Sequence, residues 1–262
     1  MTLPAALTDS RTMLRRNLQH AVRYPSLTLI VAAVPIVFLL LFVYVLGGTL
    51  GAGLGGPAGG RTEYVTYVVP GVLLLAVAGA PQGTAIAVAM DMTEGIIARF
   101  RTMSIARASV LTGHVVGSVI QTLVGLAVVL AVALLVGFRP DAGPVEWLAA
   151  TGLLALASFA LAWLAVAMGL ASPTVEAASN LPMPLLLLPF FGSGFVPTES
   201  MPAGLQWFAE HQPFTPMIET LRGLLTGTEI GSSGVVAVAW CAVLTVVGWW
   251  WARRNYEHRP AR

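Results

Sequence analysis

Six apolar stretches without an aspartate, glutamate or arginine run through this chain of 262 residues. A helix of about 20 apolar residues crosses the hydrocarbon core of a bilayer, and each stretch approaches or exceeds that length. The sequence therefore predicts an all-α membrane protein with six transmembrane helices. We place them at residues 27–48, 65–90, 113–137, 147–171, 179–196 and 233–252.

The composition excludes an ordinary soluble protein. Hydrophobic residues make up 56% of the chain and charged residues only 10%, whereas a soluble domain carries about 25% charged residues. The chain contains no lysine, so it lacks the residue with which a P-loop reaches the β- and γ-phosphates of ATP. With one cysteine and four scattered histidines, we expect no metal site and no disulfide framework.

The arginines are distributed unevenly between the loops. Eleven of the 14 lie before the first stretch, between the second and third, or after the sixth, and the other side receives Arg61, Arg139 and Arg222. Cytoplasmic loops of membrane proteins collect positive charge. We therefore expect both termini to be cytoplasmic, as an even number of spans requires.

Residues 8–25 are expected to form an amphipathic elbow helix that lies on the membrane surface. Leu14 and Leu18 fall on one side of a helical wheel, and Arg16 and Gln19 face away from it. Pro25 would then turn the chain into the first span. A disordered basic leader is the alternative for this segment.

The connection at residues 91–105 has the pattern of a short amphipathic helix. Asp91 and Glu94 are spaced as a capping box, which predicts that a helix starts there. It can be a connector that rests on lipid headgroups, or a docking helix whose Phe100 is a buried anchor in a soluble partner. The residues alone leave both interpretations open. Its apolar stripe consists of Ile96, Phe100 and Met103, with Arg99 and Arg101 off the stripe.

Residues 197–228 are too apolar for a solvated outer loop. Glycines at 192 and 194 break the fifth stretch, and Thr215 followed by Pro216 predicts an N-cap that opens a helix to about Leu225. A re-entrant helical hairpin in the outer leaflet fits this pattern. Glu219 and Arg222 are spaced for a local ion pair, and we expect them to pair with each other or with neighbouring backbone. The candidate hairpin and gate residues are Pro197, Pro202, Pro213, Pro216, Glu219 and Arg222.

Few polar side chains interrupt the apolar spans. A pathway lined mainly by leucine, valine, alanine, methionine and phenylalanine suits an amphipathic or apolar substrate, such as a drug-like antibiotic or a lipid. Aromatic residues total 8% and gather near the span ends and in the segment 197–228, so a polysaccharide ranks lower as the cargo. The polar residues that we expect along the pathway are Gln82, Thr84, Gln121 and Asn180.

Four segments, at residues 16–25, 64–71, 91–111 and 196–225, resemble the membrane subunit of type-2 ABC transporters. The similarity is to the daunorubicin-resistance-like permeases in particular, and it covers nearly the whole chain. Members of that family often have proline where Ser104 stands here. The resemblance favours the docking interpretation, with Asp91, Glu94, Gly95, Ile96, Arg99, Phe100, Arg101 and Met103 as the residues facing an ATPase.

The resemblance implies a homodimeric permease in a bacterial cell membrane, with two separate ATPase subunits docked beneath it. ATP and magnesium would bind to those subunits, so this chain would carry no cofactor and catalyse no reaction itself. The function implied is export of a hydrophobic or amphipathic substrate, and export of a polysaccharide or lipid-linked glycan is the alternative. No nucleic-acid partner is expected.

Two other classes of function are weaker. An ion-coupled transporter uses intramembrane acids or histidines to carry its ion, and the predicted spans contain no acid and no visible inverted repeat. An intramembrane protease would need Ser193 as nucleophile and His211 as base. A lone serine between glycines is a weak match to a nucleophile elbow.

Overall fold

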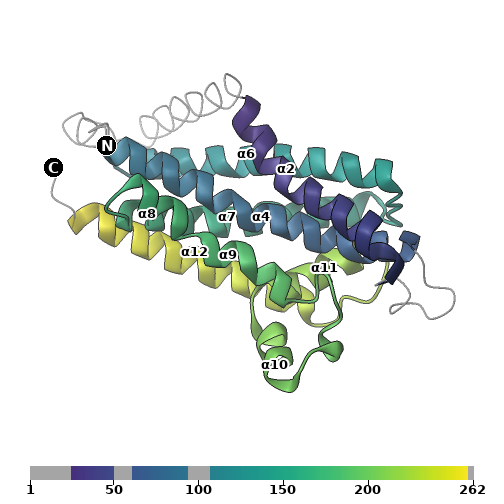
Figure 1. The fold of residues 1–262 in the computed structure, drawn as a ribbon. Helices are drawn as coiled ribbons and strands as arrows, with labels where there is room; N and C mark the ends of the chain where they lie inside the picture. Colours follow the sequence, from purple (N-terminus) through teal and green to yellow (C-terminus); the bar gives the residue numbers. More distant parts are fainter. Residues whose placement is uncertain (1–24, 50–60, 94–106, 259–262) are drawn as a thin grey trace.

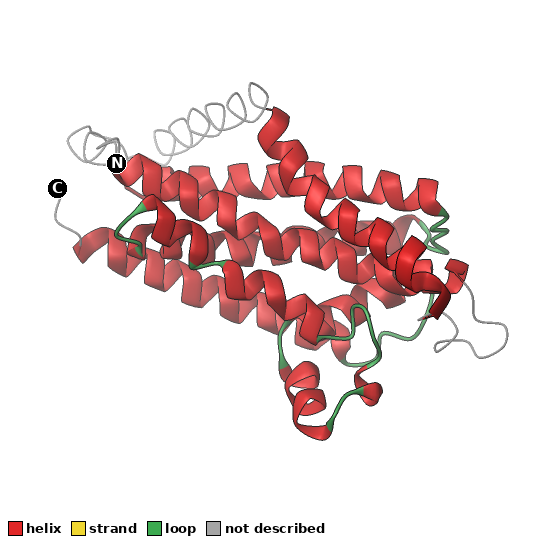
Figure 2. Cartoon of the chain, viewed as in Figure 1, coloured by secondary structure: helices red, strands yellow, loops and turns green. Residues whose placement is uncertain are grey.

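The computed structural model describes residues 25–49, 61–93 and 107–258, and this part of the chain is helical with no β-strand (Figures 1 and 2). The helices are α2 (Pro25–Leu40), η1 (Leu41–Leu46), α4 (Arg61–Thr93), α6 (Arg107–Val136), α7 (Pro144–Ala171), α8 (Val175–Asn180), α9 (Met183–Leu187), η3 (Leu188–Phe191), η4 (Thr198–Ser200), α10 (Ala203–His211), α11 (Phe214–Thr226) and α12 (Ser233–His258).

Five of the described helical segments are long and apolar enough to cross a membrane, and they lie lengthwise beside one another (Figure 1). They confirm five of the six predicted spans as long apolar helices. The first of them changes from α-helix to π-helix at η1. The five segments are Ala32–Thr49, Glu63–Thr93, Leu111–Val136, Pro144–Ala171 and Ser233–Tyr256.

The predicted span at 179–196 is not one continuous helix. Its residues form the end of α8, then α9 and η3, and a loop follows from Gly192. Three prolines, at 182, 184 and 189, fall in this short stretch. Proline has no N–H to donate and its ring collides with the preceding turn, so three prolines within eight residues remove several helical hydrogen bonds here and favour short helical pieces. Apolar composition alone could not reveal this break.

Helices α4 and α7 form the centre of the bundle. In the spanning part of α7, 72% of the residues are buried, against 22% in α12, which exposes most of its surface. Helix α7 packs against α4, α6 and α12. At Gly248 the backbones of α12 and α7 approach so closely that a Cβ would lie 2.7 Å from the Leu164 nitrogen. Such contacts through small residues are typical of helix packing in membranes.

Two ends of the bundle can be distinguished. At the Thr93 end, α4 ends at Thr93, α6 begins at Arg107 and α12 runs to His258. The opposite end carries α11 and is called the α11 end. There, α11 packs against α4, α7 and α12, whereas α10 projects sideways from the bundle (Figure 1). Gly227, with φ of 70°, ends α11 in the left-handed conformation that favours glycine.

The capping box predicted at Asp91 is wrong. Helix α4 continues through Asp91 to Thr93, so Asp91 lies in the last turn of one helix rather than at the start of another. The remainder of the predicted coupling helix, the elbow helix at 8–24 and both chain termini lie outside the described residues.

Candidate functional site

The α11 end is held together by a polar joint between α4, the loop after η3 and α11. Tyr64 and Tyr67 are three residues apart, so both lie on one face of α4. The Tyr67 hydroxyl donates to the Ser193 carbonyl oxygen at 2.9 Å, and the Tyr64 hydroxyl donates to the Phe195 carbonyl oxygen at 3.4 Å. Because this loop is not helical, its carbonyls are free to accept from side chains. We call Tyr64, Tyr67, Ser193, Phe195 and Arg222 the α11 joint.

Arg222 of α11 is the cation of this joint. Its Nη2 donates to the Ser193 carbonyl oxygen at 2.6 Å and to the Tyr67 carbonyl oxygen at 3.3 Å. Its guanidinium lies 3.9 Å from the centroid of the Tyr67 ring, in a cation–π contact. Burial lowers the pKa of Arg222 from its ordinary value, and nearby Tyr67 and Glu219 oppose that shift. Arginine stays protonated in proteins, so a half-buried positive charge remains here.

Of the two pairings expected for Glu219 and Arg222, the structure shows the bond to neighbouring backbone, made by Arg222, and not the local ion pair. Within the described residues, Glu219 accepts a hydrogen bond from the Ser233 hydroxyl at 2.9 Å, and Arg222 makes the tertiary contacts above. Residues three apart in a helix can pair, but here each side chain has a partner on another element. The long-range partners of Arg222 supply buried acceptors that an exposed local pair would lack.

A close approach of two glycines lets the loop lie directly against α4. A Cβ added to Gly71 would lie 2.5 Å from the Gly194 carbonyl oxygen, closer than real Cβ contacts allow. Only glycine at position 71 therefore permits this contact between two backbones. The distance between the loop and α4 is consequently set by the contact between the backbones of Gly71 and Gly194. The hydrogen bonds of the α11 joint depend on this short distance.

The loop that leads into α11 is fixed by Gln212 and Thr215, both buried. Gln212 accepts from the Phe214 N–H at 3.0 Å through Oε1 and donates to the Thr215 hydroxyl oxygen at 3.1 Å through Nε2. Thr215 in turn donates to the Ala209 carbonyl oxygen at 2.5 Å. The predicted N-cap at Thr215 is therefore wrong: α11 begins at Phe214, and the threonine hydroxyl binds back to α10.

The four prolines predicted in this region occupy helix starts. Pro197 precedes η4, Pro202 precedes α10 and Pro213 precedes α11. Pro216 is buried in the first turn of α11, where its missing N–H has no intrahelical partner to lose. These positions explain how an apolar segment folds into short helices rather than a span.

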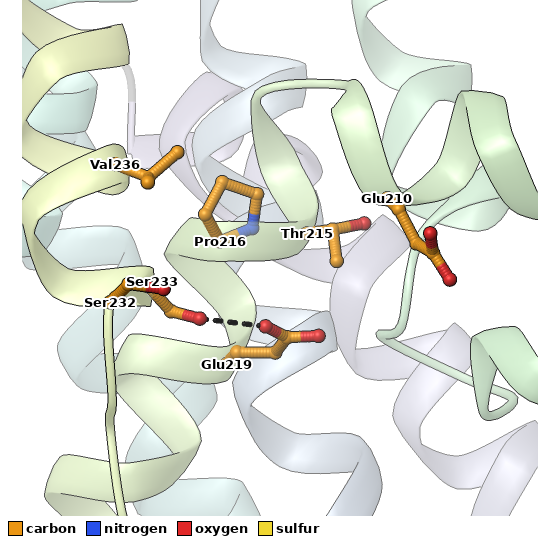
Figure 3. A pocket seen from close by; sticks show the side chains of 7 residues that line it. All are labelled: Glu210, Thr215, Pro216, Glu219, Ser232, Ser233 and Val236. Atoms are coloured by element: carbon orange, nitrogen blue, oxygen red, sulfur yellow. Dashed lines mark hydrogen bonds between the residues drawn. The ribbon is translucent and has the colours of Figure 1, made fainter.

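A hollow of about 190 Å³ opens between α10, α11 and the start of α12 (Figure 3). In Figure 3 the Glu219 carboxylate points toward Ser233, and Glu210 lies beyond Thr215 on the other side. The hollow is therefore acidic and hydroxyl-rich. Its lining residues are Glu210, Thr215, Pro216, Glu219, Ser232, Ser233 and Val236.

The residues predicted along a substrate pathway are not brought together. Thr84 of α4 donates to the Ser118 hydroxyl of α6 at 2.7 Å, while Gln82 donates to the Ser179 carbonyl oxygen of α8 at 3.1 Å. These two side chains therefore serve contacts with different neighbours of α4. Asn180 is exposed on α8, and Gln121 is half-buried on α6.

Ser193 and His211 do not form the pair that a serine protease needs. Ser193 is buried, and its hydroxyl makes no hydrogen bond within the described part of the chain. His211 is exposed on α10, where its ring stacks on Trp207 and its Nδ1 lies 2.8 Å from the Trp207 carbonyl oxygen. The geometry gives no support to the enzyme interpretation.

At the Thr93 end the structure reveals a buried pair that the sequence analysis missed. The His114 Nε2 of α6 lies 3.0 Å from the Asp91 Oδ2 of α4, and both residues are less than 10% exposed. The signal in the sequence was one histidine near the start of an apolar span. Of the predicted docking residues, Asp91 is thus directed into the bundle, and the other seven, from Glu94 to Met103, lie outside the described residues.

Residues 8–226 match the ABC-2 type transporter family. The match covers most of the chain, so the chain belongs to this family and is a transmembrane permease of the ABC-2 type. It is similar to the daunorubicin resistance ABC transporter permease protein DrrB1 of Streptomyces coeruleorubidus, with 29% identity over 243 residues, 89% of this chain and 83% of the relative. The resemblance inferred from the sequence is confirmed.

A second similarity is to the probable doxorubicin resistance ABC transporter permease protein DrrC of Mycobacterium tuberculosis. There the identity is 27% over 180 residues, which cover 69% of this chain and 65% of the relative. Both relatives are named as permeases of drug-resistance transporters. The homologues are therefore transport subunits rather than enzymes.

Proposed function

We propose that the chain is the membrane-spanning subunit of an ATP-driven exporter in a bacterial cell membrane. It would move a hydrophobic or amphipathic substrate, such as an antibiotic, out of the cytoplasm. The observation that carries this proposal is family membership over residues 8–226, together with two relatives named for resistance to daunorubicin or doxorubicin. The energy would come from a separate ATPase, because this chain has no lysine for a P-loop.

In this proposal the Thr93 end faces the cytoplasm. The arginine distribution supports this orientation, and so does the end of α12, where Arg253 lies over the Trp249 ring at 5.6 Å and Arg254 over the Trp250 ring at 5.4 Å. Tryptophan beside arginine is typical of a membrane–water interface. Residues 91–105 would then connect α4 to α6 on the side where an ATPase could dock, with Phe100 as the anchor.

The α11 joint would act as the outer gate of the transport pathway. It fixes the loop after η3 and helix α11 against α4 through the half-buried cation Arg222, and it lies at the end of the bundle opposite the proposed ATPase. Opening the joint would break the hydrogen bonds that Tyr67 and Arg222 donate to the Ser193 carbonyl oxygen. Two permease copies and two ATPase subunits, with ATP and magnesium on the latter, would make up the transporter.

The test is accumulation of daunorubicin in bacterial cells that lack their own efflux pumps. Cells that express the chain together with its ATPase should retain less drug than cells that express either subunit alone, at matched membrane levels. The purified chain alone should hydrolyse no ATP. Unchanged accumulation with both subunits present and associated would reject a drug-like substrate. Altered surface polysaccharide in those cells would favour the glycan alternative.

A further inference from the structure

The buried pair at the Thr93 end joins the two helices that the connection at 94–106 links. Asp91 lies two residues before the end of α4, and His114 lies seven residues after the start of α6. Their side chains meet at 3.0 Å from Nε2 to Oδ2. A side-chain contact therefore joins α4 and α6 close to the two residues at which the described parts of these helices stop and start.

Both members of this pair are buried. Residues of α4, α6, α7 and α12 form one buried apolar cluster at the same end of the bundle, and three of them, Val88, Leu111 and Val115, lie within one turn of Asp91 or His114 on α4 and α6. A hydrogen bond between an acid and an imidazole is electrostatically stronger in such surroundings than in water, and an unpaired group there is costly. The pair is consequently a firm contact between α4 and α6. The buried members of the cluster are Val88, Leu111, Val115, Ala162, Trp163, Val166, Ala167, Leu170, Ala252 and Tyr256.

A second polar contact joins the same two helices farther into the bundle. Thr84 of α4 donates to the Ser118 hydroxyl of α6 at 2.7 Å. Thr84 is seven residues, about two turns, before Asp91, and Ser118 is about one turn after His114. Because α4 and α6 run in opposite directions, the Asp91–His114 and Thr84–Ser118 contacts follow one another along the interface between the two helices. Both contacts oppose sliding of one helix along the other.

We propose that Asp91 and His114 are positioning residues that make the Thr93 ends of α4 and α6 move as one unit, so that force from an ATPase on their connection is delivered to both helices together. This rests on the proposed function, in which an ATPase docks on that connection. Asp91 is 8% exposed and directed into the bundle, so it acts through His114 and not as part of a docking surface. Without the pair, the ATPase would still bind, but its movement would shift one of the two helices without shifting the other.

The first experiment uses the full chain and its ATPase in proteoliposomes. Three variants are compared with wild type: Asp91→Ala, His114→Ala and the double variant. We expect each to bind the ATPase as wild type does, while daunorubicin moved per ATP hydrolysed falls about tenfold. The effects of the two single variants should be less than additive in the double variant, because each removes the Asp91–His114 contact. The control is Asn255→Ala, which removes a hydrogen bond from α12 to the Ala167 carbonyl oxygen at the same end and should leave this ratio unchanged.

A second experiment decides the question if the alanine variants fail to reach the membrane. In a Cys241→Ala background, which contains no other thiol, Asp91→Cys and His114→Cys are combined and joined by a short thiol-specific cross-linker. Helices that move as one unit tolerate this bond, so transport per ATP should stay near that of the wild type. Loss of transport on cross-linking would overturn the inference, as would alanine variants with the wild-type ratio. A wild-type chain that binds no ATPase would instead refute the proposed function.

Discussion

Arg222 of α11 and Tyr67 of α4 converge on one oxygen, the carbonyl of Ser193. The Tyr67 hydroxyl donates to it at 2.9 Å and the Arg222 Nη2 at 2.6 Å, while the guanidinium also covers the Tyr67 ring. These two residues are 155 positions apart in the chain. Two helices and a loop are therefore held at a single acceptor, and the loss of either donor should loosen all three elements.

Arg222→Ala should reduce export strongly while the chain still inserts. It removes two hydrogen bonds from a charged group, and one such bond typically contributes about 1.5–3 kcal/mol. The measurement is drug accumulation in cells at matched membrane levels of each variant. The control is Ser193→Ala, which removes a buried hydroxyl without a partner in the described structure and leaves the carbonyl in place, so it should change little. A strong loss with Ser193→Ala and none with Arg222→Ala would reject the gate and revive a catalytic role.

Gly71→Ala should destabilise the α11 end. The new methyl group would lie 2.5 Å from the Gly194 carbonyl oxygen, so the loop must move away from α4. We expect a lower midpoint of thermal unfolding in detergent, because small-to-large changes in tight packing typically cost about 1–3 kcal/mol. Gly125→Ala in α6 is the matched control: apart from the local helix backbone, no atom lies within 4 Å of its new methyl group, and alanine favours a helix by up to about 1 kcal/mol. Equal midpoints for the two variants would contradict the backbone contact.

Phe100→Ala should weaken co-purification of the ATPase. Truncation of an aromatic anchor at an interface typically costs about 2 kcal/mol or more, which is about thirtyfold in affinity. Phe208→Ala, at an exposed position on α10 near the opposite end, should leave the ATPase bound. Undiminished association in Phe100→Ala would favour the connector interpretation, in which this segment rests on lipid headgroups.

The orientation can be tested with single cysteines, because Cys241 is the only cysteine in the sequence and is buried. In a Cys241→Ala background, Glu210→Cys and Arg253→Cys place thiols at exposed positions at opposite ends of the bundle. A membrane-impermeant maleimide should label Glu210→Cys in intact cells, and Arg253→Cys only after the cells are opened. The reverse labelling pattern would overturn the proposed orientation.

The long helices were predictable because apolar length is a local property. Helices α4, α6, α7 and α12 follow the apolar stretches closely. The region 179–196 differs: it contains a shorter apolar helical stretch, Val175–Phe191, rather than one long helix. Prolines 182, 184 and 189 are apolar, so they extend a hydrophobic run while they interrupt its hydrogen bonds.

The site residues were harder to predict because their partners are distant in sequence. The spacing of Asp91 and Glu94 satisfies a capping box, yet Asp91 contacts His114, 23 residues away. Arg222 has an acid at the right local spacing, yet it contacts Tyr67 and Ser193 instead. Spacing rules compare residues within one helix and contain no information on which helices become neighbours.

Helix α4 extends from the α11 joint to the Asp91–His114 pair, and this arrangement has a mechanical consequence. Tyr67 and Asp91 are 24 positions apart on a helix that rises about 1.5 Å per residue, so about 36 Å separates the two contacts. Pro70 and Pro81 lie between them; neither has an N–H to donate to the carbonyl four residues earlier, and a helix bends most easily at such points. A force applied to α4 at Asp91 would therefore reach Tyr67 through a helix with two weakened turns, so we expect part of it to be taken up as bending at these prolines rather than as a shift of the whole helix.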